Sequence, residues 1–311
     1  MLREGGIEDL AAEPSHKYSR TIPLPDDRLL RALGVGGSAA TGGDLVVSSV
    51  ARVAEAARPA LALDLIGVER ITVSGHGPFA LPSWDPEATV GSWVGEGSAG
   101  ATPALTVHEV ETSPKQAIAS VTLSRRLVKA VDQIENDVLA EIRRATAATI
   151  ESGFLNGLGG LQPLGLLNTP GAQVQTWLST SPSRAELVLQ MKDYANAHGS
   201  LSRARWLMNS NLAASMLTTE VSATSGQFVL SVDPGGRPLI MGIPAVIADH
   251  LPDGRLLLLD PSTVKVVYWG NPYALANPFA NDVAGDLRLT VYNACDIACL
   301  QPAQLTIGKV A

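Results

Sequence analysis

The clearest pattern of hydrophobic and polar positions lies near the middle of the chain, where apolar or small side chains recur every three or four residues. This spacing places them on one side of a helix. They are Leu127, Val131, Ile134, Val138, Ile142, Ala145 and Thr149. Ser124 is a suitable N-cap and Gly153 disfavours continuation. The pattern therefore predicts a helix from Ser124 to about Ser152, a rod of ~42 Å.

Before this helix the pattern changes to the alternation that is typical of strands. Residues 71–82, 104–110 and 115–124 are rich in β-forming side chains, and a long stretch with Gly, Pro and Trp separates the first two. We therefore predict a projecting hairpin made of two extended runs. Residues 1 to about 45 are interrupted by prolines and predict an arm, followed by a short amphipathic helix at 48–58.

After the long helix, helices and strands follow each other without a regular rhythm. Ser183 and Glu186 form a capping box for a helix that Gly199 ends. A second helix is expected to end near Thr219. The expected strands are 205–208, 238–249, 255–260, 263–269, 287–292 and 304–308. This order predicts an α+β fold and argues against a doubly wound sheet or an eightfold barrel.

Composition and charge exclude several classes of protein. Hydrophobic residues make up 46% of the 311 residues and charged residues 17%, which allows a sizeable core and excludes a mainly disordered chain. The net charge of −7 gives no overall basic surface for nucleic acid. No apolar run reaches the ~18 residues of a membrane helix. The two cysteines, Cys295 and Cys299, cannot form a structural zinc site alone.

No catalytic, cofactor-binding or metal-binding constellation stands out. None of the five histidines has a second ligand-type residue at metal spacing. The histidines are His16, His76, His108, His198 and His250. No serine lies in a G-x-S-x-G elbow. The glycine-rich stretch 157–171 follows a helix instead of a strand, so it predicts a tight turn and no dinucleotide site. A soluble α+β enzyme with a deep polar pocket at Asp249–His250 remains an alternative.

Charge is distributed unevenly around the predicted hairpin. Residues 71–114 contain no Lys or Arg, whereas they contain acidic residues and two of the five tryptophans. The long helix carries four arginines. We expect the hairpin to lie on a neighbouring copy of the chain with these arginines nearby, because aromatic residues are enriched at interfaces. The alternative is a solvated acidic loop with its tryptophans tucked into their own core. The expected interface residues are Trp84, Asp85, Glu87, Trp93, Glu96, Arg125, Arg126, Arg143 and Arg144.

The order of these features resembles the major capsid proteins of tailed phages, which share the Hong Kong 97-like fold. The matching features are an arm, a two-stranded loop with Trp-Val-Gly-Glu-Gly at 93–97, and a strand that leads through Ser124 into a long helix. They continue with Pro-Leu-Gly-Leu-Leu at 163–167, Trp-Leu-Met-Asn-Ser at 206–210 and the strand region 239–254. The resemblance covers roughly residues 45–311.

The resemblance implies an N-terminal arm, a projecting two-stranded loop, a long spine helix, and peripheral and axial domains. Carried onto this sequence, the divisions are 1–65 for the arm and short helices, 66–103 for the projecting loop, 104–165 for the peripheral domain with the spine helix, 166–280 for the axial domain, and 281–311 for closing strands that return to the peripheral domain.

The resemblance also implies a function without a catalytic centre or cofactor. Such proteins self-assemble as hexamers and pentamers into an icosahedral shell around double-stranded DNA, with scaffolding, portal and decoration proteins as further partners. The expected location is the virion, after assembly in the host bacterial cytoplasm and without a membrane.

Some relatives crosslink a loop lysine to an asparagine with the help of a glutamate. Here no lysine lies between Lys17 and Lys115, and Leu287 and Ala294 occupy the asparagine and glutamate positions. We therefore expect a shell without covalent crosslinks. An encapsulin-type nanocompartment shell that encloses a cargo enzyme is the alternative within the same fold.

Overall fold

The structure is a computed structural model that describes residues 61–75, 77–84, 93–100, 107–124, 134–222, 226–281 and 285–311. The chain forms two compact units, Met1–Val50 and Ala51–Ala311, and all described residues belong to the second. The predicted arm and the helix predicted at 48–58 lie outside the described residues.

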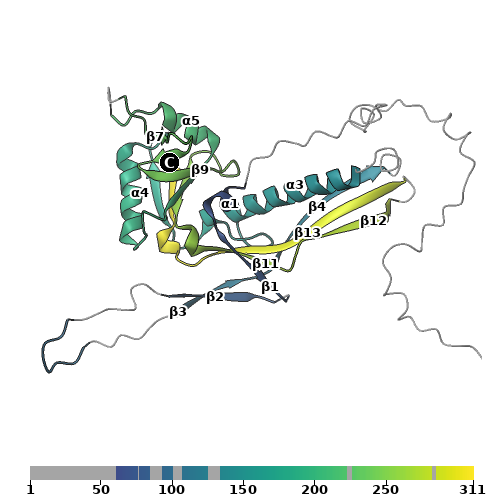
Figure 1. Ribbon diagram of the computed structural model, residues 1–311, viewed down its shortest axis with the longest axis horizontal. Coiled ribbons are helices and arrows are strands. Elements are labelled where there is room, and N and C mark those ends of the chain that lie inside the picture. Colours follow the sequence, from purple (N-terminus) through teal and green to yellow (C-terminus); the bar gives the residue numbers. More distant parts are fainter. Residues whose placement is uncertain are drawn as a thin grey trace, which may run out of the picture. The chain divides into compact units, whose positions relative to one another are not determined.

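One part of the second unit is a five-stranded sheet (Figure 1). Its order is β1, β11, β13 and β12, and β4 pairs with β13 along residues 286–295. The bounds are Glu69–Val73 for β1, Lys115–Ser124 for β4, Val264–Trp269 for β11, Tyr273–Asn281 for β12 and Asp286–Cys299 for β13. The long strand β13 therefore organises this sheet by contacting three others.

Helix α3 (Ile134–Asn156) packs against one face of this sheet. Ile142 forms a buried cluster with Leu123, Leu289 and Val291 of the strands. These contacts confirm the predicted helix over its central part and explain its one-sided apolar stripe, because that stripe faces the sheet.

Both ends of the helix differ from the prediction. Ser124, the expected cap, is the last residue of β4, and residues 125–133 lie outside the described part of the chain. At the other end α3 continues through Gly153. Phe154 and Leu155, which follow it, are 2% and 0% exposed. Burial of these side chains outweighs the ~1 kcal/mol that glycine costs inside a helix.

The predicted hairpin is present, but its first predicted run, 71–82, is divided. Residues 71–73 belong to β1, which pairs with β11 in the first sheet, and the hairpin begins with β2. Strands β2 (Phe79–Trp84) and β3 (Val107–Thr112) pair antiparallel, with the two ends of β2 opposite the two ends of β3. Leu81 and Ser83 are buried, whereas their neighbours along β2 are more exposed. The strand thus has one side that faces the molecule.

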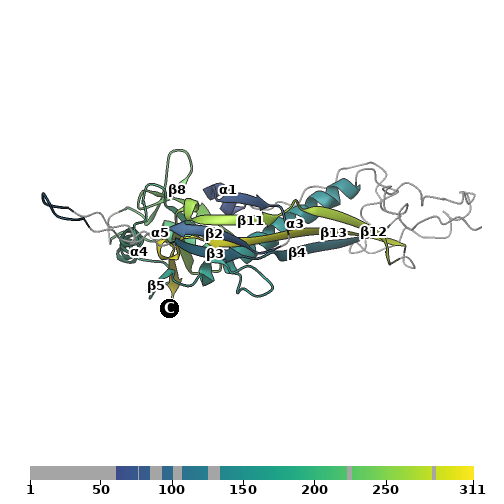
Figure 2. The same cartoon turned by 90° about the horizontal axis from the view of Figure 1, so that it is seen from below.

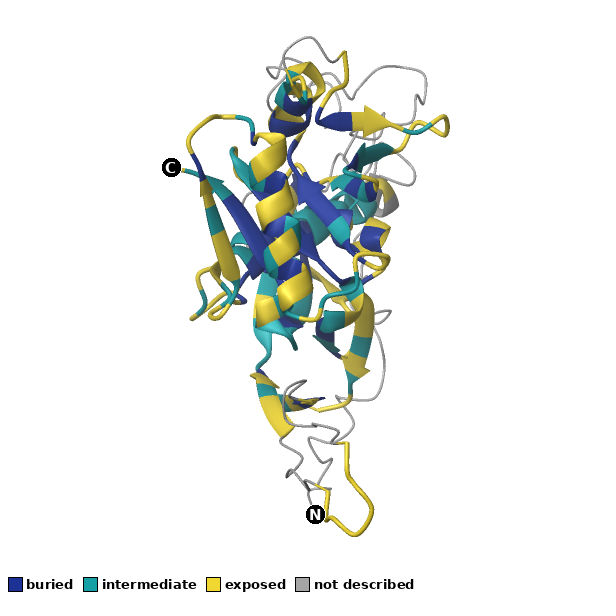
Figure 3. Ribbon diagram, turned by 90° about the vertical axis from the view of Figure 1, so that its left-hand side faces the viewer, coloured by how far each residue is buried: buried dark blue, intermediate teal, exposed yellow. Residues whose placement is uncertain are grey.

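A second sheet has seven strands in the order β5, β14, β10, β6, β9, β8 and β7. Their bounds are Gln173–Trp177, Thr306–Val310, Arg255–Leu259, Arg205–Met208, Ile243–Ile247, Pro238–Ile240 and Leu230–Val232. Helices α4 (Arg184–Asn196) and α5 (Ser210–Thr218) cover one face of the sheet and share a core with it. Figure 3 shows the contrast between the buried central strands and the exposed outer side of the helical layer.

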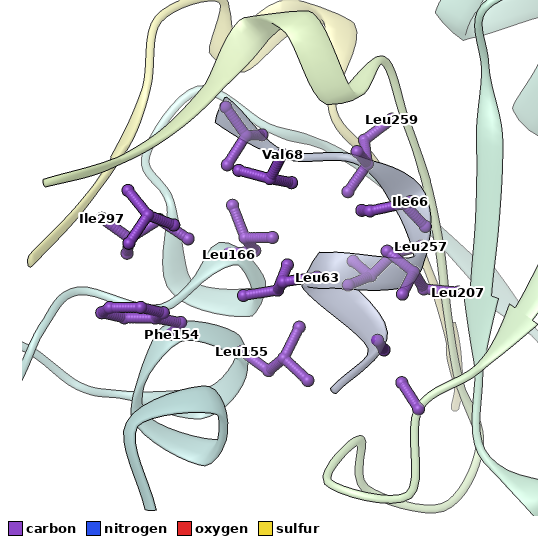
Figure 4. Packing of buried hydrophobic residues seen from close by; sticks show 14 of the residues in the cluster. Leu63, Ile66, Val68, Phe154, Leu155, Leu166, Leu207, Leu257, Leu259 and Ile297 are labelled. Atoms are coloured by element: carbon purple, nitrogen blue, oxygen red, sulfur yellow. The ribbon is translucent and has the colours of Figure 1, made fainter. Parts of the chain in front are cut away.

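A common core joins the two sheets. The short helix α1 (Ala62–Ile66) inserts Leu63 between Phe154 and Leu155 of α3 and Leu257 of β10, as Figure 4 shows. Ile297 of the first sheet belongs to the same cluster. Short 3₁₀ helices lie between the other elements at Leu166–Asn168 (η4), Pro261–Thr263 (η5) and Pro302–Gln304 (η6).

Sheet membership in the second half of the chain does not follow chain order, and the expected division into peripheral and axial domains stays a prediction. Strands β11 and β12, which fall within 166–280, belong to the first sheet together with α3. The closing segment 281–311 is split, because β13 joins the first sheet and β14 joins the second. These pairings are long-range, and the hydrophobic pattern of a strand does not indicate its partner.

Candidate assembly interface

The base of the hairpin lies on the sheet face opposite α3 (Figures 1 and 2). Leu81 of β2 forms a buried cluster with Val267 and Trp269 of β11 and Ala298 of β13. In addition, the indole nitrogen of Trp269 donates to the carbonyl oxygen of Gly77 at 2.8 Å. The hairpin is therefore held by apolar contacts at its base.

Polar contacts fix the same base at both of its strands. Ser83 Oγ donates to the carbonyl oxygen of Leu300 at 2.9 Å, and Gln301 Nε2 donates to the carbonyl oxygen of Trp84 at 2.7 Å. On the return strand the backbone amide of Ser113 donates to Asp296 Oδ2 at 2.9 Å. Burial raises the pKa of Asp296, and the Ser113 amide opposes that shift by stabilising the carboxylate.

These contacts also give the direction of the hairpin. Thr112 at the root of β3 adjoins Ser113, which contacts Asp296, whereas Trp84 at the far end of β2 contacts Gln301. The hairpin therefore runs past the end of β13, away from the half of β13 that pairs with β12. Figure 1 shows β2 and β3 extending in the opposite direction from β12.

The distal hairpin exposes large apolar side chains. Trp84 is 60% exposed and Val94 49%, and Trp93 is fully exposed. Glu96 is exposed in the same short segment. Within one chain, these tryptophans are not tucked into their own core, which contradicts the alternative of a loop that folds back.

The uncovered half of the first sheet also exposes apolar side chains. Ile118, Tyr273, Leu275 and Phe279 are each at least half exposed. The strand register places Ile118, Tyr273 and Leu275 on the face opposite α3, and Phe279 lies in a β-bulge of β12. Tyr273 stacks on Tyr292 with ring centroids 5.0 Å apart. No described residue of the chain covers this surface. It is an apolar face of the kind that marks an interaction site.

The structure places the other predicted interface residues as follows. Arg143 is exposed on α3, and Arg144 contacts Glu141 one turn earlier at 3.6 Å between side-chain atoms. The remaining four predicted residues lie outside the described part of the chain, and they are Asp85, Glu87, Arg125 and Arg126. Their contact with a neighbouring copy therefore stays a prediction.

The alternative enzyme centre at Asp249–His250 is not supported by the geometry. His250 borders a depression of about 550 Å³ that is lined largely by small residues of α3 and by Lys115, and Asp249 does not line it. His250 Nε2 lies 3.6 Å from Glu151 Oε2. Among the described residues, no group of three or more His, Cys, Asp or Glu side chains is arranged to hold a metal ion.

Sequence reasoning missed the role of Glu151. Its Oε1 accepts from the backbone amide of Leu63 at 3.1 Å, so this carboxylate of α3 caps α1, whose own N-cap residue, Leu61, makes no side-chain cap. Glu151 is 4% exposed, and burial raises its pKa, whereas the Leu63 amide and His250 lower it. The sequence signal for this contact is the apolar Leu61 at the start of α1, which cannot cap the helix with its side chain. That signal does not indicate which residue accepts the hydrogen bond from the Leu63 amide.

A model of the phage capsid family matches residues 56–310. The structure is similar to the capsid of a native GTA particle, with a TM-score of 0.65 and 16% identity over 89% of this chain and 100% of that chain. No curated protein matches the sequence.

Two further structures share the fold. The capsid of Gordonia phage Cozz has a TM-score of 0.62 and 14% identity over 93% of this chain and 98% of that chain. The SrpI encapsulin of Synechococcus elongatus has a TM-score of 0.60 and 16% identity, covering 89% and 96%. These likenesses confirm the predicted α+β fold of the Hong Kong 97-like type. Of the helices that the structure describes, none combines the length and apolar character needed to cross a bilayer.

Proposed function

The chain belongs to the phage capsid family, and we propose on this basis that it is a major capsid protein that self-assembles into an icosahedral phage head around double-stranded DNA. The family and fold indicate a structural protein and not an enzyme. The known structures with this fold include assembled capsids, which supports a shell built from many copies of this chain.

The observation that carries this proposal is the apolar surface that the single chain leaves exposed. Trp93 on the distal hairpin is fully exposed, and Tyr273 on the sheet face is 59% exposed. The hairpin runs past the end of β13, away from the half of β13 that carries this surface, so the described part of the hairpin does not cover it in the same chain. A neighbouring copy can, and repetition of such a contact between two different surfaces closes into rings when the rotation allows it.

The interface in this proposal consists of the hairpin and of helix residues on the adjacent subunit. It includes the nine residues predicted from the sequence, of which Trp84, Trp93 and Glu96 lie on the hairpin and are exposed. Ion pairs at such a rim contribute only ~0–1 kcal/mol each, so they set the register of neighbouring copies more than their affinity.

Two finer parts of the proposal concern DNA and crosslinks. A net charge of −7 suits a container whose DNA must move during packing and release, because strong phosphate binding would hinder that movement. The shell is proposed to be non-covalent, since the described hairpin has no lysine and Leu287 and Ala294 carry no amide or carboxyl side chain. The protein would reside in the virion after assembly in the host cytoplasm, with scaffolding, portal and decoration proteins as partners.

The test is to purify the expressed chain and examine it by negative-stain electron microscopy. Closed shells, sheets or capsomer rings support the proposal, and a uniform monomer at every concentration and salt contradicts it. A denaturing gel of mature particles should show one band. A ladder of heavier bands would show that the shell is crosslinked.

A nanocompartment shell is a second candidate, because the SrpI encapsulin shares the fold at a similar TM-score. The absorbance ratio at 260 and 280 nm of nuclease-treated particles separates the two. Protected nucleic acid favours a phage head, whereas particles that contain a co-purified protein and no nucleic acid favour the nanocompartment.

A further inference from the structure

Two cationic side chains are cross-strand neighbours in the second sheet. Arg255 of β10 and Lys309 of β14 are directly opposite in an antiparallel pair, and like charges in that position destabilise a sheet. No carboxylate oxygen of the described residues lies within 4 Å of either side chain. The nearest acidic residue along the chain, Asp253, instead accepts hydrogen bonds from Asn209 and Asn211. The described part of the chain thus supplies no counter-charge for this pair.

The two cations border a depression of about 390 Å³ with an apolar wall. The apolar part of the wall is formed by Leu158, Leu167, Val174, Pro252 and Ile307, of which Leu158 and Val174 are 76% and 51% exposed. Two asparagines, Asn156 and Asn168, also line the depression. This combination selects for a ligand that places an apolar group beside a negative charge. A nucleic-acid backbone fits it less well, because phosphates require several cations and no apolar wall.

The depression is formed within the single chain before any partner binds. The loop after α3 is closed on itself, because the amide of Gly165 donates to the carbonyl oxygen of Gly157 at 2.9 Å and Leu158 forms a β-bridge with Leu164. A second contact ties the same loop to η4, since Asn168 Nδ2 donates to the carbonyl oxygen of Gly157 at 2.9 Å. The position of Leu158 is therefore fixed by backbone contacts.

The hairpin tip of another copy has the complementary chemistry. Trp93, Val94 and Glu96 are exposed within four residues, so large apolar groups lie beside a carboxylate. A turn presents them, in which the amide of Ser98 donates to the carbonyl oxygen of Gly95 at 3.1 Å and Gly97 has a φ of 79°. The segment 71–114 contains no cation that could oppose the approach to Arg255 and Lys309.

We propose that this depression is the seat of the hairpin tip of a neighbouring copy, with the Glu96 carboxylate between Arg255 and Lys309 and the tip's apolar side chains against the wall at Leu158 and Val174. This rests on the proposed shell function, because only assembly brings a second copy to this position. It assigns Glu96 at the tip to the second sheet and leaves the arginines of α3 to other residues of the hairpin. Tip and seat are different surfaces, so the contact runs head to tail.

A charge exchange in the full chain tests the seat. Glu96→Lys alone and Arg255→Glu with Lys309→Glu should each raise the concentration at which particles form by about tenfold, because like charges then meet. All three substitutions together should restore particle formation toward the wild-type concentration. Glu109→Lys, the same charge change on the exposed shaft of the hairpin, is the matched control and should change assembly little. Circular dichroism melts of the unassembled variants check that each still folds.

Cysteine pairing gives a second readout. Glu96→Cys combined with Arg255→Cys should form dimers and a ladder on non-reducing gels of particles. Glu96→Cys combined with Lys192→Cys should not, because Lys192 is exposed on α4, which covers the other face of the second sheet. If wild-type chain forms no particles at all, the shell function fails. If particles form but the exchange restores nothing and the disulfide does not appear, the seat alone is wrong. A double variant that assembles normally and only loses DNA would also overturn the seat.

Discussion

Gly165→Ala probes the close approach that ends the long helix. A Cβ atom at Gly165 would lie 2.5 Å from the nitrogen of Gly157 and 2.7 Å from both the nitrogen of Asn156 and the carbonyl carbon of Leu155. All three neighbours are backbone atoms, so no side-chain rotation can relieve the contact. The chain would have to move away from the end of α3, and this movement breaks the hydrogen bond from Gly165 to Gly157.

The magnitude follows from three contributions. Forced backbone shifts in a packed region cost ~1–3 kcal/mol, and the lost hydrogen bond costs about 1 kcal/mol. The smaller entropy of the unfolded alanine chain offsets ~0.4–1 kcal/mol. The expected loss of unfolding free energy is therefore ~1–3.5 kcal/mol, which lowers the melting temperature by about 2–14 °C for a unit of this size.

The assay is denaturant unfolding of the unassembled chain, followed by circular dichroism. Gly77→Ala is the matched control, because a Cβ there has no atom within 4 Å and its φ lies outside the left-handed region. We expect the control to unfold within ~0.5 kcal/mol of wild type. Equal unfolding midpoints for Gly165→Ala and Gly77→Ala would refute the close packing of the loop against α3.

Three further predictions concern the core, a buried carboxyl and the hairpin. Phe154→Ala, which empties a site that is 2% exposed, should lower the unfolding free energy by ~3–5 kcal/mol in the same assay; a loss below 1 kcal/mol would contradict its burial. The pKa of Glu151 is raised above 4.5, so its ionised form destabilises the fold and this destabilisation disappears as the pH falls through the raised value. Glu151→Gln should therefore be at least as stable as wild type at pH 7, and its advantage should shrink at pH 4.5; a variant weaker than wild type only at pH 7 would show that the ionised form stabilises. Trp93→Ser should leave the melting temperature of the unassembled chain unchanged and reduce particle yield, because Trp93 is fully exposed in one chain; light scattering and a melt measured on the same sample distinguish the two effects.

The elements of this fold were predictable where a local pattern determines them. The apolar stripe through Ile142 predicted the central part of α3, and two runs rich in β-forming residues predicted the hairpin. The end of α3 was not predictable, because Gly153 is tolerated only where Phe154 and Leu155 are buried by distant strands. Local patterns indicated the type of these elements but not what they pack against, and helix α1, which has no such pattern, was not predicted.

The partners across the sheets and the proposed seat depend on register, which the sequence does not contain. Arg255 and Lys309 are 54 positions apart in the chain and become opposite neighbours only through the pairing of β10 with β14. The need for glycine at position 308 also depends on strand pairing, because a Cβ atom there would lie 1.9 Å from the ring of Trp177 on the neighbouring strand β5. The hairpin residues were chosen from charge and aromatic content, and their exposure required the structure. Their contact with a neighbouring copy stays a prediction.

A map of assembled particles by electron cryo-microscopy, at a resolution that shows side chains, tests the central claim most directly. The account predicts that the indole of Trp93 is covered by residues of a different copy of the chain. A map in which Trp93 packs against its own chain, or points into solvent with no neighbour nearby, would contradict the account.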